Sequence, residues 1–199
     1  MVTEAGGNAD SLSERKRRRA KAAIRQAALE LFTERGYDAV SVTDIAARAE
    51  VGRTTFFRYF GDKQEVLFPA AEEAEMADPL PRPAGVMEPI GSALTDALRA
   101  TRSLVVNYVA SIAADPKAYI QHEKLVHSHP ELYARSLVKQ RSYADRLTRI
   151  LQSWGAAPTV ARQAAEMGMA CFYVAQATAN DDPRTLVREV SRAFDRLES

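Results

Sequence analysis

The 199-residue sequence has a single cysteine, three histidines and no long apolar segment. One cysteine, Cys171, excludes a disulfide within the chain and a zinc site built from several thiolates. The longest apolar-rich stretch, 104–114, is far shorter than the roughly 20 residues that cross a bilayer, so we expect no membrane association. The N-terminal MVTEAGGNADSLSE lacks the apolar centre of a secretory signal. These absences predict a cytoplasmic protein.

Motifs that carry catalysis are missing as well. The chain has no glycine-rich phosphate loop, no nucleophile elbow and no HExxH helix. His122 and His129 could share a helix face, but no acidic or cysteine partner stands at a metal-binding spacing. We therefore predict no catalytic residues, no metal and no cofactor. A small helical enzyme stays open as an alternative, which turnover of a ligand would support.

Basic residues concentrate in one part of the chain. Residues 15–68 contain 12 Lys or Arg against 7 Asp or Glu, although the net charge of the whole chain is only +1. The run RKRRR at 15–19 begins this segment. A local basic excess suits a phosphate partner, and a solvated helix end is the alternative interpretation. Residues 1–14 are polar and acidic, and we predict a disordered tail there.

The most informative stretch is SVTDIAARAEVGRTTFFRYFGDKQEVL, residues 41–67. Ser41-x-x-Asp44 forms a capping box that begins a short helix, and a tight turn then leads to a second helix over about 53–60. Phe56 and Phe60 are four residues apart and face inward on that second helix. A short helix that buries phenylalanines and exposes arginine, threonine and tyrosine suits the DNA major groove.

These residues resemble the TetR family of transcriptional regulators. The resemblance lies on GRTTFFRYFGDKQEVL and on the preceding AALELFTERGYDAVSVTDIAARAEV, so it covers about 20–67. It implies an all-α protein in which a three-helix helix-turn-helix DNA-binding domain precedes a helical effector-binding and dimerisation domain, about nine helices in total. It further implies a ligand-responsive repressor that binds a palindromic operator on double-stranded DNA as a homodimer.

Three positions depart from the family pattern. Glu50 stands where the turn usually has glycine, and a left-handed conformation there costs a non-glycine residue roughly 1 kcal/mol. Gly52 replaces the usual serine or threonine cap of the second helix, which weakens that cap. Phe57 stands where a tyrosine usually offers its hydroxyl to a phosphate. Tyr59 is the nearest hydroxyl that could replace it.

The domain layout follows from helix patterns and prolines. We predict a tail over 1–14, the DNA-binding domain over 15–68, a helix end with a proline-rich linker over 69–84, and the effector and dimer domain over 85–199. A fourth helix should begin at Lys63 and continue to about residue 76, bent at Pro69. The other long helices are predicted over 19–35, 88–114, 117–128, 130–154, 158–179 and from 183 onward.

Three sets of functional residues are predicted. DNA should be contacted by Arg17, Arg18, Arg19, Thr43, Arg53, Thr54, Thr55, Phe57, Tyr59 and Lys63. A small, largely apolar effector should be bound by Tyr108, Ile112, Leu125, Leu147, Met167 and Cys171, for which plain core packing is the alternative. The dimer interface should contain Tyr173, Leu186, Val190, Ala193, Phe194 and Leu197.

Two questions about function remain open at this stage. HPELYARSLVKQRSYADRLTRIL, which begins at His129, resembles a branch of the family whose effectors include acyl-CoA thioesters. This resemblance adds an acyl-CoA-like ligand to the candidate effectors. A helix-turn-helix activator, or a DNA-binding protein without an effector, is the alternative to a ligand-responsive repressor. A core filled with side chains among the later helices would favour that alternative.

Overall fold

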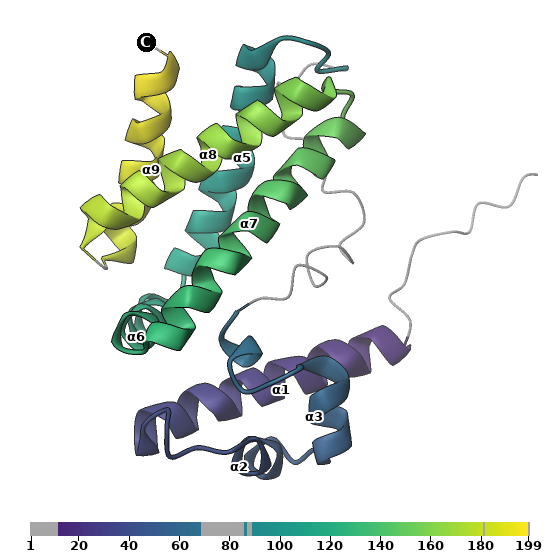
Figure 1. The fold of residues 1–199 in the computed structure, drawn as a ribbon, viewed down its shortest axis with the longest axis vertical. Coiled ribbons are helices and arrows are strands. Elements are labelled where there is room, and N and C mark those ends of the chain that lie inside the picture. Colours follow the sequence, from purple (N-terminus) through teal and green to yellow (C-terminus); the bar gives the residue numbers. More distant parts are fainter. Residues whose placement is uncertain (1–11, 69–85, 87–88, 181, 199) are drawn as a thin grey trace, which may run out of the picture. The chain divides into compact units, whose positions relative to one another are not determined.

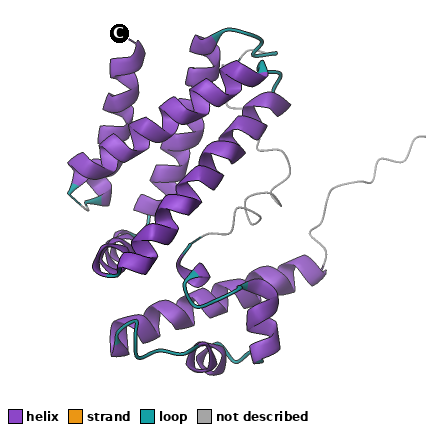
Figure 2. Ribbon diagram, viewed as in Figure 1, coloured by secondary structure: helices purple, strands orange, loops and turns teal. Residues whose placement is uncertain are grey.

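The computed structural model describes residues 12–68, 86, 89–180 and 182–198. In this part of the chain the regular structure is helical, with eight α-helices, one 3-10 helix and no strand (Figure 2). The all-α fold class is therefore confirmed. The chain divides into two compact units, Met1–Pro69 and Ala70–Ser199. Most of the predicted tail and the predicted linker over 69–84 lie outside the described residues.

The first unit contains α1 (Leu12–Arg35), α2 (Val42–Arg48), α3 (Arg53–Tyr59) and the 3-10 helix η1 (Glu65–Leu67). Its core contains the apolar stripe of α1, and α1 packs against α2 and η1 (Figure 1). The stripe is buried as its spacing predicts, and consists of Ile24, Ala27, Ala28, Leu31 and Phe32. Gly36, with φ +81°, follows the end of α1.

Two helix boundaries in this unit differ from the prediction. α1 begins at Leu12 rather than near residue 19, so the last residues of the predicted tail and the whole basic run are helical. Arginine, lysine, alanine and leucine all have high helix propensity, which outweighs the mutual repulsion of the cations here. The predicted fourth helix is a single 3-10 turn over Glu65–Leu67 within the described residues. Its predicted continuation to residue 76 falls outside them.

The second unit contains α5 (Leu94–Ala113), α6 (Pro116–Ser128), α7 (Pro130–Ser153), α8 (Pro158–Ala179) and α9 (Pro183–Glu198). Each of the last four helices begins with a proline, which suits the first helical position because no partner for its missing N–H is needed there. α8 packs against α5, α7 and α9 (Figure 1). No helix in the described part of the chain is long and apolar enough to cross a bilayer.

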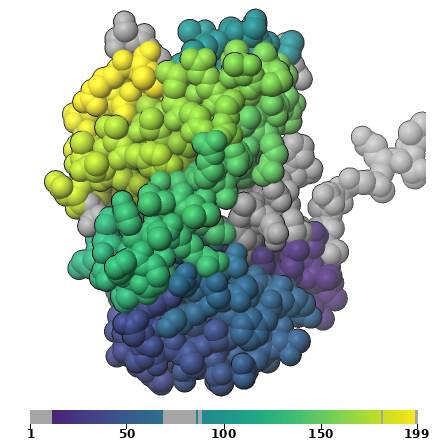
Figure 3. Space-filling model, in the orientation of Figure 1, coloured from purple at the N-terminus to yellow at the C-terminus, as the bar shows by residue number. Residues whose placement is uncertain are grey.

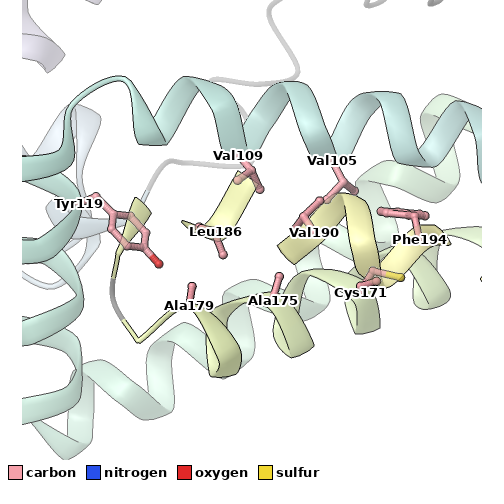
Figure 4. Close-up of a cluster of buried hydrophobic side chains, with 10 residues drawn as sticks. Val105, Val109, Tyr119, Cys171, Ala175, Ala179, Leu186, Val190 and Phe194 are labelled. Carbon is pink, nitrogen blue, oxygen red and sulfur yellow. The ribbon is translucent and has the colours of Figure 1, made fainter. Parts of the chain in front are cut away.

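One core cluster of this unit corrects a sequence prediction. Leu186, Val190 and Phe194 of α9 are each 0% exposed and pack against α5 and α8 within the same unit (Figure 4). Ala193 is also buried there, at 7% exposed. Four of the six residues assigned to the dimer interface therefore form the core of the protomer. An apolar seam shows only that a helix must bury one face, and here the chain itself covers that face.

Candidate nucleic-acid interface

The start of α2 is fixed by the predicted capping box. The Ser41 hydroxyl accepts the Asp44 N–H at 3.2 Å, and the Asp44 carboxylate accepts the Ser41 N–H at 2.8 Å. Hydrogen bonds from Ser41, first from its hydroxyl and then from its backbone, hold the pKa of Asp44 below its usual value, and Arg35 adds to the effect. The cap therefore fixes the residue at which α2, the first helix of the helix-turn-helix, begins.

The turn between α2 and α3 confirms the strain predicted for Glu50. Its φ is +53°, the left-handed region that glycine adopts at lower cost. The following residue, Val51, donates its N–H to the Ala46 carbonyl at 2.9 Å, which closes the turn. Gly52 then precedes α3 without a side-chain cap. The turn thus contains a strained residue and a second backbone hydrogen bond, from the Glu50 N–H to the Ala47 carbonyl at 3.1 Å.

Phe56 of α3 and Phe60, which directly follows the helix, are buried, and α3 exposes a mostly polar face. Phe56 is 0% and Phe60 1% exposed, and their ring centroids lie 5.7 Å apart. The exposed side chains are Arg53, Thr54, Phe57 and Arg58, while Thr55 and Tyr59 are half-buried. The predicted DNA residues of this helix thus lie on an accessible surface, and Thr43 on α2 is exposed as well.

The three arginines predicted from the basic run do not share one surface. Consecutive residues of an α-helix are separated by about 100° around its axis, so Arg17, Arg18 and Arg19 point in three directions. Arg17 is half-buried and the other two are exposed. Lys21 lies one turn after Arg17 and on the same side; it belongs to the basic segment of the sequence but was not among the predicted DNA-contacting residues. Its Nζ lies 6.0 Å from the centre of the Tyr59 ring of α3.

Tyr59 lies within a small cationic group. The Arg58 guanidinium lies 4.9 Å from the centre of the Tyr59 ring and donates a hydrogen bond to its hydroxyl at 3.2 Å. Lys21 approaches the same ring from α1. Lys21, two residues after the basic run on α1, and Arg58 of α3 therefore come together at Tyr59. In the sequence, only the four-residue spacing of Arg17 and Lys21 indicates that these two side chains lie on the same face of α1.

Lys63 has partners that the sequence did not indicate. Its ammonium donates to the Tyr37 carbonyl at 2.8 Å and to the Val40 carbonyl at 3.0 Å, and it lies 4.0 Å from the centre of the Tyr37 ring. These contacts join the α1–α2 loop to the segment after α3. Two of the three donors of the ammonium are thus used inside the unit. A contact between Lys63 and a DNA phosphate stays a prediction.

Ion pairs hold α2 against α1. Arg48 contacts Glu34 at 2.8 Å and Glu30 at 3.4 Å, and Arg35 lies 3.8 Å from Asp44. The hydrogen bond from Arg48 is the main reason why the pKa of Glu34 is lowered. These groups are solvent-exposed, so each pair contributes little to stability and is weakened by salt. They link the surfaces of α2 and α1, while the buried Ile45 and Ala46 of α2 supply its apolar contacts.

The predicted effector residues do not all meet at one place. Ile112 and Leu147 pack on the same core cluster as Cys171, whereas Met167 packs on a second cluster around Leu98, Leu151 and Trp154. Cys171 is 4% exposed, and burial raises the pKa of its thiol. Leu125 is half-buried on α6. The structure therefore brings three of the six predicted residues together.

Tyr108, the remaining predicted effector residue, belongs to an aromatic group. Its ring centroid lies 6.4 Å from that of Tyr143 on α7 and 6.3 Å from that of Phe172 on α8. Phe172 in turn packs on the cluster that contains Cys171. Because Tyr108 is 42% exposed, this aromatic group extends from the protein surface to that buried cluster.

A capped helix, a tight turn and a second helix with a polar outer face define a helix-turn-helix DNA-binding protein. Residues 24–69 match the family model described as bacterial regulatory proteins, tetR family. This match places residues 24–69 in the TetR family, and the match to TcmR extends the similarity over 152 residues. The resemblance seen in residues 20–67 is thus confirmed, and the acyl-CoA-like branch is not.

Two relatives illustrate how far the similarity extends. The chain is 36% identical over 152 residues to the HTH-type transcriptional regulator TcmR of Streptomyces glaucescens, a match that covers 75% of this chain and 66% of TcmR. It is 52% identical over 46 residues to the HTH-type transcriptional repressor Rv3405c of Mycobacterium tuberculosis, which covers 23% of this chain and 24% of that one. The chain thus spans just under two thirds of TcmR and about a quarter of Rv3405c.

A solved structure shares the fold. The TetR family repressor FadR of Thermus thermophilus, in complex with lauroyl-CoA, has a TM-score of 0.54 with this chain. The two are 19% identical, and the match covers 89% of this chain and 93% of FadR. At this identity the comparison shows a common arrangement of helices, and it assigns no ligand to this chain.

Proposed function

We propose that the protein is a ligand-responsive transcriptional repressor that binds a palindromic operator as a homodimer and is released by a small-molecule effector. The polar outer face of α3, supported from below by Phe56 and Phe60, carries this proposal. The names of TcmR, a regulator, and Rv3405c, a repressor, support it. The protein would act in the cytoplasm and would not be an enzyme.

The dimer is proposed to form through the outer faces of α8 and α9. A single α3 can read only one half-site, and a two-fold dimer supplies the second. Ala170, Val174 and Ala177 are exposed and recur at helical spacing on α8, and Leu197 on α9 is 41% exposed. Tyr173 is half-buried beside them. This surface replaces the inward-facing seam of α9 in the proposed interface.

The effector is proposed to be small and largely apolar, and to bind where Tyr108 meets the cluster of Ile112, Leu147 and Cys171. Aromatic rings with one exposed member provide an apolar surface that a ligand can cover. An acyl-CoA thioester, whose acyl chain is apolar although its coenzyme A part is charged, stays a further candidate. The effector would act by binding more tightly to the conformation that does not fit the operator.

The first experiment identifies the operator. DNA bound from a random pool should converge on a palindrome whose half-sites are separated by about 34–36 Å or a multiple of that distance. Arg53→Ala should then relax the sequence preference at one position per half-site, at a cost of about 1–3 kcal/mol. A pool that shows no enriched sequence would contradict the proposal.

The second experiment tests release. Operator complexes are titrated with acyl-CoA of several chain lengths, with the matching free fatty acids, and with aromatic apolar compounds. Release by one class at a concentration that leaves the fold intact supports the repressor and names its effector. If release depends on the coenzyme A part, free fatty acids of the same length should have no effect.

A DNA-binding protein without an effector is the second candidate. The observation in its favour is that Ile112, Leu147 and Cys171 already pack together in one apolar cluster. In that case no compound would change operator affinity, and thermal unfolding of the second unit would not shift with any of them.

A further inference from the structure

Phe57 is an unusual side chain for its position on α3. It is 48% exposed on a helix whose other exposed residues are Arg53, Thr54 and Arg58. Among the described residues of the first unit, Leu12 is the other exposed large apolar side chain, and it lies at the far end of α1. A single exposed apolar residue is common on protein surfaces. Its place on the face proposed to meet DNA gives this one a testable role.

The Phe57 ring has a defined neighbour. Its centroid lies 5.5 Å from that of Phe56, and the two rings meet edge to face at 81°. Because Phe56 is fully buried, this contact holds the exposed ring against the core of the unit. Arg53 and Thr54 precede Phe57 by four and three residues, so their side chains are its neighbours on the helix surface. The ring therefore sits, oriented, beside two groups suited to reading bases.

We propose that Phe57 reads sequence by packing its ring against the 5-methyl group of a thymine in the major groove. This inference rests on the proposed DNA-binding function. A phenyl ring has no donor or acceptor for a phosphate or a base edge. The thymine methyl is the one apolar group that a base pair presents in the major groove, and phenylalanine is among the side chains that contact it. The ring thus adds an apolar contact beside the polar contacts of Arg53 and Thr54.

The test removes only the methyl group. Each thymine of the selected operator is replaced in turn by uracil, which keeps every hydrogen-bonding group of the base edge. Loss of one buried methyl should weaken binding about fourfold at one position per half-site. Phe57→Ala should bind thymine and uracil operators equally, whereas Phe57→Tyr, which keeps the ring, should still distinguish them. Cytosine and 5-methylcytosine at that position should differ in the same direction.

Thr54→Ser is the matched control, because a threonine methyl can also contact a thymine methyl. The Thr54→Ser protein should still bind the uracil operator about fourfold more weakly than the thymine operator. If the effect is lost in Thr54→Ser and kept in Phe57→Ala, or if uracil has no effect anywhere in a bound operator, this inference is wrong while the proposed function stands. Absence of any selected operator would instead remove the proposed function itself.

A second measurement uses the unmodified protein. With 5-iodouracil in place of the sensitive thymine, the iodine occupies the position of the methyl group, and irradiation links it to the side chain in contact. Mass spectrometry of the linked peptide should identify Phe57. A link to any other residue would overturn the assignment even if the Phe57→Ala protein failed to fold.

Discussion

Glu50 stands where the TetR family usually has glycine, and its backbone is strained. Its φ of +53° places a non-glycine residue in the left-handed region at the turn of the helix-turn-helix. Glu50→Gly should raise the free energy of unfolding of the first unit by about 1 kcal/mol, because glycine adopts this conformation without the clash of a Cβ atom. Chemical denaturation followed by circular dichroism measures the change.

Glu50→Ala is the control for this prediction. It removes the same negative charge and keeps the Cβ atom, so the strain should remain and the stability gain should be absent. Equal stabilisation by alanine and glycine would show that charge, rather than backbone strain, sets the cost of Glu50.

Lys63 joins two segments of the same unit through the Tyr37 and Val40 carbonyls. Lys63→Met should lower the free energy of unfolding by about 1–3 kcal/mol, because two backbone acceptors lose a charged donor. These carbonyls use two of the three donors of the ammonium, so the third is the one that would contact a DNA phosphate as predicted. A slope lower by about one unit would show that Lys63 also contacts a phosphate.

At the scale of helices, the crossing of α5 and α8 depends on Gly168. A Cβ atom at this position would lie 2.3 Å from Cγ2 of Thr101, which is itself 0% exposed. Gly168→Ala should therefore destabilise the second unit by about 1–3 kcal/mol, the usual cost of overpacking a core. Thermal unfolding of the two units, each followed by its own probe, measures where the loss falls.

The companion substitution Thr101→Ser removes the one methyl group that would clash. The double variant Gly168→Ala with Thr101→Ser should recover most of the stability lost by Gly168→Ala alone, a coupling that a double-mutant cycle quantifies. If the two substitutions were simply additive, the close approach of α5 and α8 would not be the cause of the loss.

At the scale of the whole molecule, the proposed dimer depends on the outer face of α8. Part of the surface that α7 and α8 form on the second unit faces the viewer in Figure 3. Val174 is 48% exposed on α8, so Val174→Glu should leave the protomer folded but place like charges across the two-fold axis. We expect folded monomers in analytical ultracentrifugation and a large loss of operator affinity, although every DNA-facing residue is intact.

Val138→Glu on α7 is the matched control, because Val138 is an exposed valine, at 68%, outside the proposed interface. It should remain a dimer and bind the operator normally. Val190→Glu should behave differently from both, because Val190 is 0% exposed within the protomer and a charge there should prevent folding. A Val174→Glu protein that stays a dimer would move the interface away from α8.

Features that depend on neighbours along the chain could be predicted from the amino-acid sequence. The capping box of Ser41 and Asp44, the inward pair Phe56 and Phe60, and the strain at Glu50 all follow from spacings of four residues or fewer or from one residue type at one turn. Such signals need no knowledge of distant segments. They were enough to predict the helix-turn-helix, whereas the all-α class of the whole chain was implied by the resemblance to the TetR family.

The partner that each surface meets could be seen only once the chain was folded. The seam of Leu186 and Val190 shows that α9 buries one face, but a stripe of this kind fits its own chain as well as a second copy. The fold places it against α5 and α8, so a dimer must use another surface. Likewise, Lys63 contacts carbonyls 26 and 23 residues earlier, a pairing created only when the loop and the turn are brought together.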